Sequence, residues 1–128
     1  MEQEINMAKG GISKTIRLGD EEVKVRMSAV TPILYNQLIN RDFFKDLANF
    51  NDSFNSSKRE DGLDIDMFVF KGLCYVGIYQ SSKKELPKFI DWLDGYKDVD
   101  FANAFMDLLE CWNENSSGTA KEKNTASE

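Results

Sequence analysis

Two pairs of carboxylates are the residues of this chain that could do chemistry. Asp64 with Asp66, and Asp91 with Asp94, could act as general acid and base, because that work needs two carboxyl groups in different environments. A structural role is favoured for both pairs. The first precedes an apolar helix, where negative charge stabilises the helix N-terminus, and the second lies on the polar side of a surface helix. The carboxylates therefore do not predict an enzyme.

Other residue types that carry chemistry are scarce. The chain has no histidine and only two cysteines, Cys74 and Cys111, so the commonest general base and any recognisable zinc pattern are missing. Both cysteines are expected as reduced core thiols, with a disulfide as the alternative. Gly10-Gly11 lacks both the preceding strand and the following Lys-Ser/Thr pair of a phosphate-binding loop. We expect no catalytic residue, no metal and no cofactor.

Aromatic side chains are better candidates for function, since a domain of short helices cannot easily hide all of them. Phe43 and Phe44 are adjacent and point about 100° apart on a helix, so one can face the core while the other faces solvent. Burial is favoured for any single aromatic, because only a contiguous exposed patch signals a partner. Phe44 and Trp92 are the best exposed anchors. The predicted partner-binding residues are Phe43, Phe44, Phe50, Phe54, Trp92 and Tyr96.

The elements that must position these aromatics begin with a β-hairpin. Apolar and polar residues alternate over 15–18 and again over 23–27, and residues 19–22 supply a turn. Two antiparallel strands with one apolar face are predicted, and helices must cover that face.

Two short amphipathic helices come next, over 32–39 and 42–50. Thr31 is expected as the N-cap, Pro32 as the first helical residue and Asn40 as the break between the helices. The polar stretch 51–62 then predicts an exposed loop, with Phe54 as its one tether.

A helix over 63–79 is apolar nearly all round and is therefore expected at the centre of the fold. Gly72 and Gly77 would weaken it in isolation, so close approach of another helix is expected there. A buried strand over 74–79 remains an alternative, because periodicity does not exclude it.

The C-terminal part predicts a short helix over 86–93, with Pro87 in its first turn and Gly95 just past its end. The last helix starts at Asp98 or Asp100 and reaches Trp112, which closes the core or acts as a hinge between the domain and a C-terminal tail. Residues after Trp112 include no aromatic or branched aliphatic side chain, which predicts that this tail is disordered.

Length and charge bound the remaining possibilities. A chain of 128 residues fits one domain, and 16 basic against 22 acidic side chains give a net charge of −6, which disfavours nucleic-acid binding. No secretory signal or transmembrane stretch is found, so a cytoplasmic protein without membrane contact is expected.

The predicted fold is α+β: an N-terminal antiparallel hairpin packed on a mostly helical bundle of about five helices. Its predicted parts are a flexible N-terminus at 1–13, one domain at 14–113 and a disordered polar tail at 114–128.

The order and spacing of these elements resemble a known family, the tail assembly chaperones of long-tailed (siphovirus-type) bacteriophages and prophages of Gram-positive bacteria. The resemblance spans roughly residues 15–112, and the chain departs from it at 36–40, where a more basic, glycine-containing stretch is expected. The segments that carry it are the hairpin 15–27, Thr31-Pro32-Ile33-Leu34-Tyr35, Arg41-Asp42, Phe44-Lys45-Asp46-Leu47, the apolar helix 67–79, Trp92-Leu93 and Leu108-Leu109-Glu110-Cys111-Trp112.

This resemblance implies a non-enzymatic factor that keeps the tape measure protein soluble and helps the tail tube protein polymerise around it. It also implies residence in the cytoplasm of the bacterial host, absence from the mature virion, and a longer product of the same gene made by ribosomal frameshifting. A homo-oligomer is a further expectation. The alternatives from other classes are a small structural tail component, such as a completion or connector protein, and a prophage regulatory adaptor.

Overall fold

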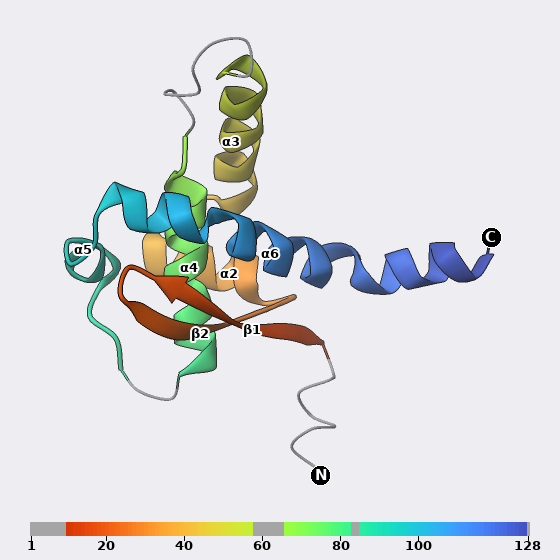
Figure 1. The fold of residues 1–128 in the computed structure, drawn as a ribbon, viewed down its shortest axis with the longest axis horizontal. Coiled ribbons are helices and arrows are strands. Elements are labelled where there is room, and N and C mark those ends of the chain that lie inside the picture. Colours follow the sequence, from red (N-terminus) through yellow and green to blue (C-terminus); the bar gives the residue numbers. More distant parts are fainter. Residues whose placement is uncertain (1–9, 58–65, 83–84, 128) are drawn as a thin grey trace.

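The structure, a computed structural model, describes residues 10–57, 66–82 and 85–127, and within them all side chains except those of 56–57 and 117–127. Its elements are β1 (Gly11–Leu18), β2 (Glu21–Ser28), α2 (Thr31–Ile39), α3 (Phe43–Ser57), α4 (Phe68–Ser81), α5 (Phe89–Leu93) and α6 (Asp98–Ser127) (Figure 1). The predicted α+β class, with an antiparallel hairpin and five helices in the described part of the chain, is confirmed.

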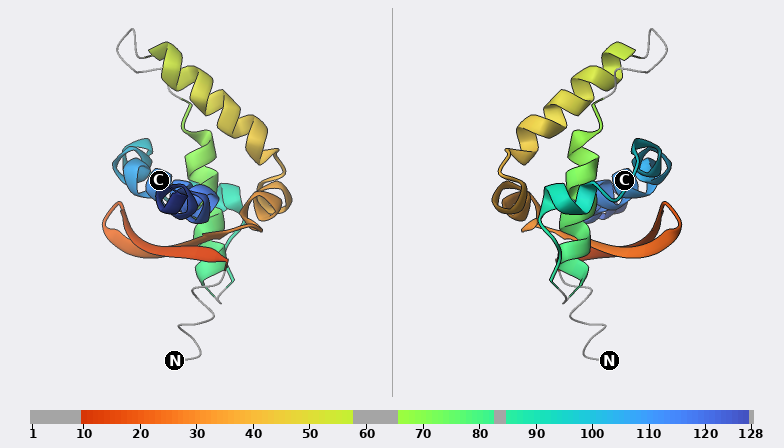
Figure 2. Two further views of the ribbon diagram at one scale, coloured as in Figure 1. Left: turned by 90° about the vertical axis from the view of Figure 1, so that its right-hand side faces the viewer. Right: turned by 90° about the vertical axis from the view of Figure 1, so that its left-hand side faces the viewer.

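The hairpin is antiparallel with one buried face, as predicted, but Glu21 and Glu22, which were expected in the turn, belong to β2. Ile16 pairs with Val23, and the turn passes through Gly19, whose φ of 65° favours glycine. β2 packs mainly on α4, and β1 on α6. Figure 2 shows the hairpin lying across one end of α4 while α3 extends away from the other end. β1 already begins at Gly11, which pairs with Ser28, so residues 11–13 of the predicted flexible N-terminus belong to the sheet; residues 1–9 lie outside the described chain.

The start of α2 differs from the prediction by one residue. Thr31 is the first helical residue and not the N-cap, because its hydroxyl is used elsewhere: it accepts the Ser28 N–H (2.8 Å) and donates to Gln80 Oε1 of α4 (2.6 Å). The helix ends as predicted at Asn40, which adopts the left-handed conformation at a φ of 66°.

The next helix, α3, is longer than predicted. Asp42 caps it, since its carboxylate accepts the N–H groups of Phe44 (3.0 Å) and Lys45 (3.2 Å). The helix continues to Ser57, so the predicted loop over 51–62 is wrong for its first seven residues, and residues 58–62 lie outside the described chain. Phe54 is held within this helix by stacking on Phe50, with ring centroids 5.7 Å apart. Packing of this kind overrides the weak helix propensity of asparagine and serine.

The central helix α4 is buried as predicted, and the alternative strand over 74–79 is excluded because these residues are helical. Both glycines mark close approaches. Gly72 lies against Tyr35 and Ile39 of α2, whereas Gly77 lies against Val25 of β2, so only the first approach is to another helix.

The C-terminal elements close the core. α5 begins at Phe89, so Pro87 precedes the helix and does not lie in its first turn. On α6, Trp112 is 9% exposed and its ring centroid lies 4.9 Å from that of Phe43, which confirms that it closes the core. The helical backbone of α6 runs on to Ser127 and projects from the rest of the ribbon (Figure 1), where composition predicted disorder over 114–128. No helix in the described ranges is long and apolar enough to cross a membrane.

Candidate functional site

An open groove lies between the start of α2 and the start of α3, and we call it the α2–α3 groove. Two large apolar side chains stay exposed beside each other here: Ile33 of α2 is 55% exposed and Phe44 of α3 is 62% exposed. The groove has a volume of about 410 Å³. It is lined by Pro32, Ile33, Asn36, Gln37, Asp42, Phe43 and Phe44. An apolar surface with a polar amide rim is suited to docking another polypeptide.

An ionic network around the buried Asp46 carboxylate fixes α2 and α3 relative to each other, and the Arg41 side chain in it is 49% exposed. The Tyr35 hydroxyl of α2 donates to Asp46 Oδ2 of α3 (2.7 Å). Arg41, in the turn between them, donates from Nε to Oδ2 (2.9 Å) and from Nη2 to Oδ1 (2.6 Å) of the same carboxylate. The Arg41 guanidinium also lies 4.5 Å from the centroid of the Phe68 ring at the start of α4. Three consecutive helices are thus tied together, and the network reaches the groove through Tyr35, whose ring packs on the lining residue Phe43.

The network keeps the Asp46 carboxylate ionised although it is only 4% exposed. Burial alone would raise the pKa of Asp46, but the hydrogen bonds from Arg41 and Tyr35 outweigh that effect and hold the pKa below its ordinary value. Burial, reinforced by the bond to Asp46, raises the pKa of Tyr35 well above the usual range for tyrosine, so its hydroxyl stays a donor. The groove therefore rests on a satisfied polar network.

Phe43 and Phe44 separate as their spacing predicted. Phe43 is 1% exposed and packs edge-on against Tyr35 at 5.2 Å, whereas Phe44 points to solvent with its ring 5.1 Å from that of Phe43. Of this predicted pair, Phe44 offers a contact surface and Phe43 supports it from the core.

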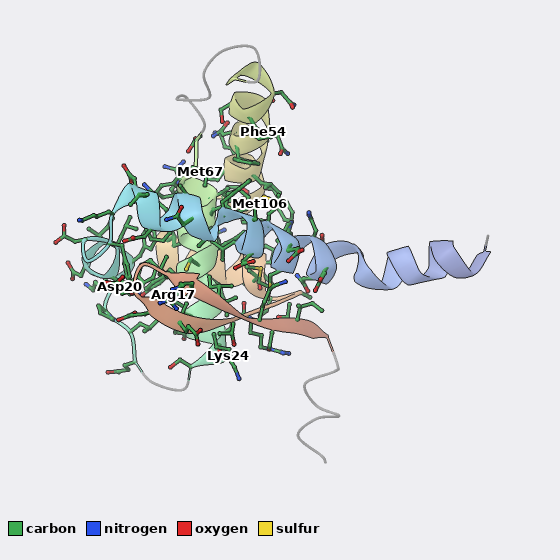
Figure 3. All side chains as sticks on the ribbon, in the orientation of Figure 1. Arg17, Asp20, Lys24, Phe54, Met67 and Met106 are labelled. Atoms are coloured by element: carbon green, nitrogen blue, oxygen red, sulfur yellow. The ribbon has the colours of Figure 1, made fainter. Side chains whose placement is uncertain are left out.

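The other predicted site residues do not join the groove. Phe50 is buried against Phe70 of α4, and Phe54 stands farther along α3, 38% exposed (Figure 3). Tyr96, half-buried, lies after α5, where its ring contacts Trp92 at 5.0 Å.

The expectation that Trp92 is an exposed anchor was wrong. Its side chain is 8% exposed and lies among rings from three parts of the chain, Tyr75 of α4, Phe89 of α5 and Phe101 of α6. The short helix α5 presses its aromatic side onto α4, which removes the indole from solvent.

The residues considered for catalysis have structural surroundings. Asp66 accepts the Phe68 N–H (3.0 Å) at the start of α4, while Asp64 lies outside the described residues. Cys74 and Cys111 are free, buried thiols, and burial raises the pKa of Cys74 to about 12 and that of Cys111 to about 11. Among the described residues no group of three or more His, Cys, Asp or Glu side chains could hold a metal ion.

Sequence reasoning missed Asp46, the residue whose bonds to Tyr35 and Arg41 tie α3 to α2. A signal was present, since Asp46 falls three residues after Phe43 and four before Phe50, on the apolar side of its helix. A carboxylate at such a position is buried only when paired, and Arg41 and Tyr35 are near enough in sequence to be its partners.

The fold and its surface together define a small α+β domain with an exposed apolar groove. Comparisons with protein-family models, with curated proteins and with solved structures find no match for this chain.

Proposed function

We propose that this protein is a non-enzymatic tail assembly chaperone of a bacteriophage or prophage, which binds and solubilises the tape measure protein and promotes assembly of the tail tube. The observation that carries the proposal is the α2–α3 groove, where Ile33 and Phe44 stay exposed on two helices that the Asp46 network holds together. Four residues that line this groove belong to segments that carry the family resemblance, Pro32, Ile33, Asp42 and Phe44, whereas Asn36 and Gln37 lie in the stretch 36–40 where the chain departs from it.

The chemistry of the client suits such a surface. A tape measure protein is a long helix with apolar stripes, and an apolar groove receives such a helix through side chains spaced three and four residues apart. The net charge of −6 keeps a complex of many chaperones on one client dispersed.

The proposal places the protein in the cytoplasm of the bacterial host and outside the mature virion. Its partners are the tape measure protein and the tail tube protein, and a longer frameshifted form of the chain would share the described domain. The polar C-terminal segment would then serve as the link to the added part.

Co-expression tests this function. The chain is expressed together with the protein encoded by the long reading frame downstream, and the products are analysed by size-exclusion chromatography with light scattering. A stoichiometric complex, with the partner insoluble when expressed alone, supports the chaperone. A soluble partner that elutes separately rejects it, and recovery of the chain in purified particles would instead identify a completion or connector protein. If no such reading frame overlaps downstream, the regulatory adaptor is favoured.

A further inference from the structure

A second hollow lies beside α5, and we call it the α5 hollow. Its volume is about 470 Å³, and its most prominent apolar side chain is Ile90, which is 69% exposed. Half-buried Leu93 and Tyr96 continue the apolar surface. None of the residues that line the α2–α3 groove lines the α5 hollow.

The rim of the α5 hollow is acidic. Asp91, Asp94 and Asp98 surround it, and Lys71 of α4 is the one basic residue in its lining. The Lys71 ammonium lies 2.8 Å from Asp98 Oδ1, so that pair is neutral and the other two carboxylates give the hollow a net charge of −2. An apolar centre with an anionic rim selects a partner surface that carries long cationic side chains.

The outer face of the hairpin, which turns away from α4 and α6, is such a surface. The strand register places three cross-strand pairs on it: Ser13 with Arg26, Thr15 with Lys24, and Arg17 with Glu22. Three cations against one anion make the net charge of this face +2, in a chain whose total charge is −6. Figure 3 shows Lys24 on the side of the hairpin away from α6.

Within one molecule the hairpin approaches the hollow at its turn, where the Tyr96 hydroxyl donates to Glu21 Oε1 (3.4 Å), but Glu21 does not belong to the cationic face. The α5 hollow is formed by residues of α4, α5, the segment after α5 and the start of α6. The cationic face points away from α4 and α6 because the opposite face of the hairpin packs on them. We infer that the cationic hairpin face of one copy docks in the α5 hollow of a second copy. The contact is head-to-tail, so each added copy presents both surfaces again.

The contact buries little area and is weak. Each strand has eight residues, so the hairpin face is about 26 Å long and covers roughly 250 Å², against about 800 Å² per partner in stable complexes. Aliphatic stems of Lys24 and Arg26 would cover Ile90 while their charged ends reach Asp91 and Asp94. The inference does not depend on the proposed function, because the α2–α3 groove stays open.

The inference is tested by sedimentation equilibrium of the full chain. Concentrations up to about 1 mM are used, because weak complexes become populated only in that range. Two single reversals disrupt the two sides, Lys24→Glu on the hairpin and Asp94→Lys in the hollow. Lys45→Glu and Asp52→Lys are matched controls, since they make the same changes of charge at exposed positions elsewhere.

The wild-type mass is expected to rise with concentration above the monomer value of 14.6 kDa. Each reversal should weaken association at least about tenfold, and the controls should leave it unchanged. An equimolar mixture of Lys24→Glu and Asp94→Lys should associate again, because one carries an intact hollow and the other an intact hairpin face; this also shows that both variants are folded.

Three results would overturn the inference. The wild type could remain monomeric over the whole range. Loss of association in Lys24→Glu but not in Asp94→Lys would indicate a symmetric contact between two hairpins. Association of the mixture no stronger than that of either variant alone would show that the two surfaces do not bind each other. Should Asp94→Lys not fold, Asp91→Lys gives the same test.

Discussion

Gly72 of α4 lies directly against the ring of Tyr35 of α2, and no β-carbon fits between them. An ideal Cβ on Gly72 would overlap Tyr35 Cε2 and lie 2.8 Å from Ile39 Cδ1. The close approach holds the Tyr35 hydroxyl within reach of Asp46, so packing at this glycine and the ionic network around Asp46 support each other.

Replacing Gly72 by alanine should therefore destabilise the protein, although alanine is the better helix former. Overpacking costs about 1–3 kcal/mol and the gain in helix propensity is about 1 kcal/mol, so a net loss of up to about 2 kcal/mol in the free energy of unfolding is expected in urea titrations. Gly95→Ala is the control, since its Cβ would meet only the Trp92 carbonyl oxygen at 3.5 Å. Equal stability of the two variants would contradict the packing described.

Asp46→Asn should lower the free energy of unfolding by about 2 kcal/mol, because it removes the negative charge that pairs with Arg41 and accepts the Tyr35 hydroxyl. Asp52→Asn, an exposed carboxylate on the same helix, should change stability by less than about 0.5 kcal/mol. Urea unfolding followed by circular dichroism measures both. A loss of similar size in the two variants would show that the network contributes nothing specific.

The same carboxylate should make stability depend on pH. The folded-state pKa of Asp46 lies below its ordinary value near 3.9, so the ionised form stabilises the fold above that value, and this contribution is lost as the pH falls through the folded-state pKa. Unfolding free energies measured from pH 6 down to pH 3 should therefore decline more steeply for the wild type than for Asp46→Asn. Asp98 and Glu110, whose pKa values are also lowered, are exposed and contribute little. The same dependence of stability on pH in the wild type and in Asp46→Asn would contradict this contribution of Asp46.

Both cysteines should be unreactive in the folded protein. A buried thiol whose pKa is raised to about 12 at Cys74 and about 11 at Cys111 forms almost no thiolate at neutral pH. Labelling by an aromatic disulfide reagent at pH 7.5 should be more than about 100-fold slower than in 8 M urea. Labelling of either cysteine at the rate of the unfolded chain would mean that the core opens readily around it.

The sequence was sufficient for the parts of the fold that obey local rules. Alternation of apolar residues predicted the hairpin, and the polar Asn40 correctly marked the end of α2. It was insufficient where distant packing decides: α3 continues past Phe50, whose ring packs on Phe70 of α4 and Phe105 of α6, and Ser53 accepts the Asp66 N–H (2.8 Å).

For the candidate site, too, the sequence was sufficient where local geometry decides and insufficient where distant packing does. The separation of Phe43 from Phe44 followed from helical geometry, so one exposed anchor was predicted correctly. Trp92 was not, because its burial depends on rings from α4 and α6 that no local pattern places beside it. Ile33 was missed although a signal was present: the residues three and four positions after it are Asn36 and Gln37, so helical geometry already places it on the polar side of α2, where it is 55% exposed.

The central claim is that the α2–α3 groove binds the client, and the most direct measurement compares two variants in the complex with the tape measure protein. Phe44→Ser removes an exposed side chain from the groove, and Met106→Ser removes one from α6 that is similarly exposed, at 65% against 62% (Figure 3). Titration calorimetry with a soluble helical fragment of the client should show binding weakened at least about tenfold by Phe44→Ser and unchanged by Met106→Ser. Equal affinities of the two variants would contradict the account.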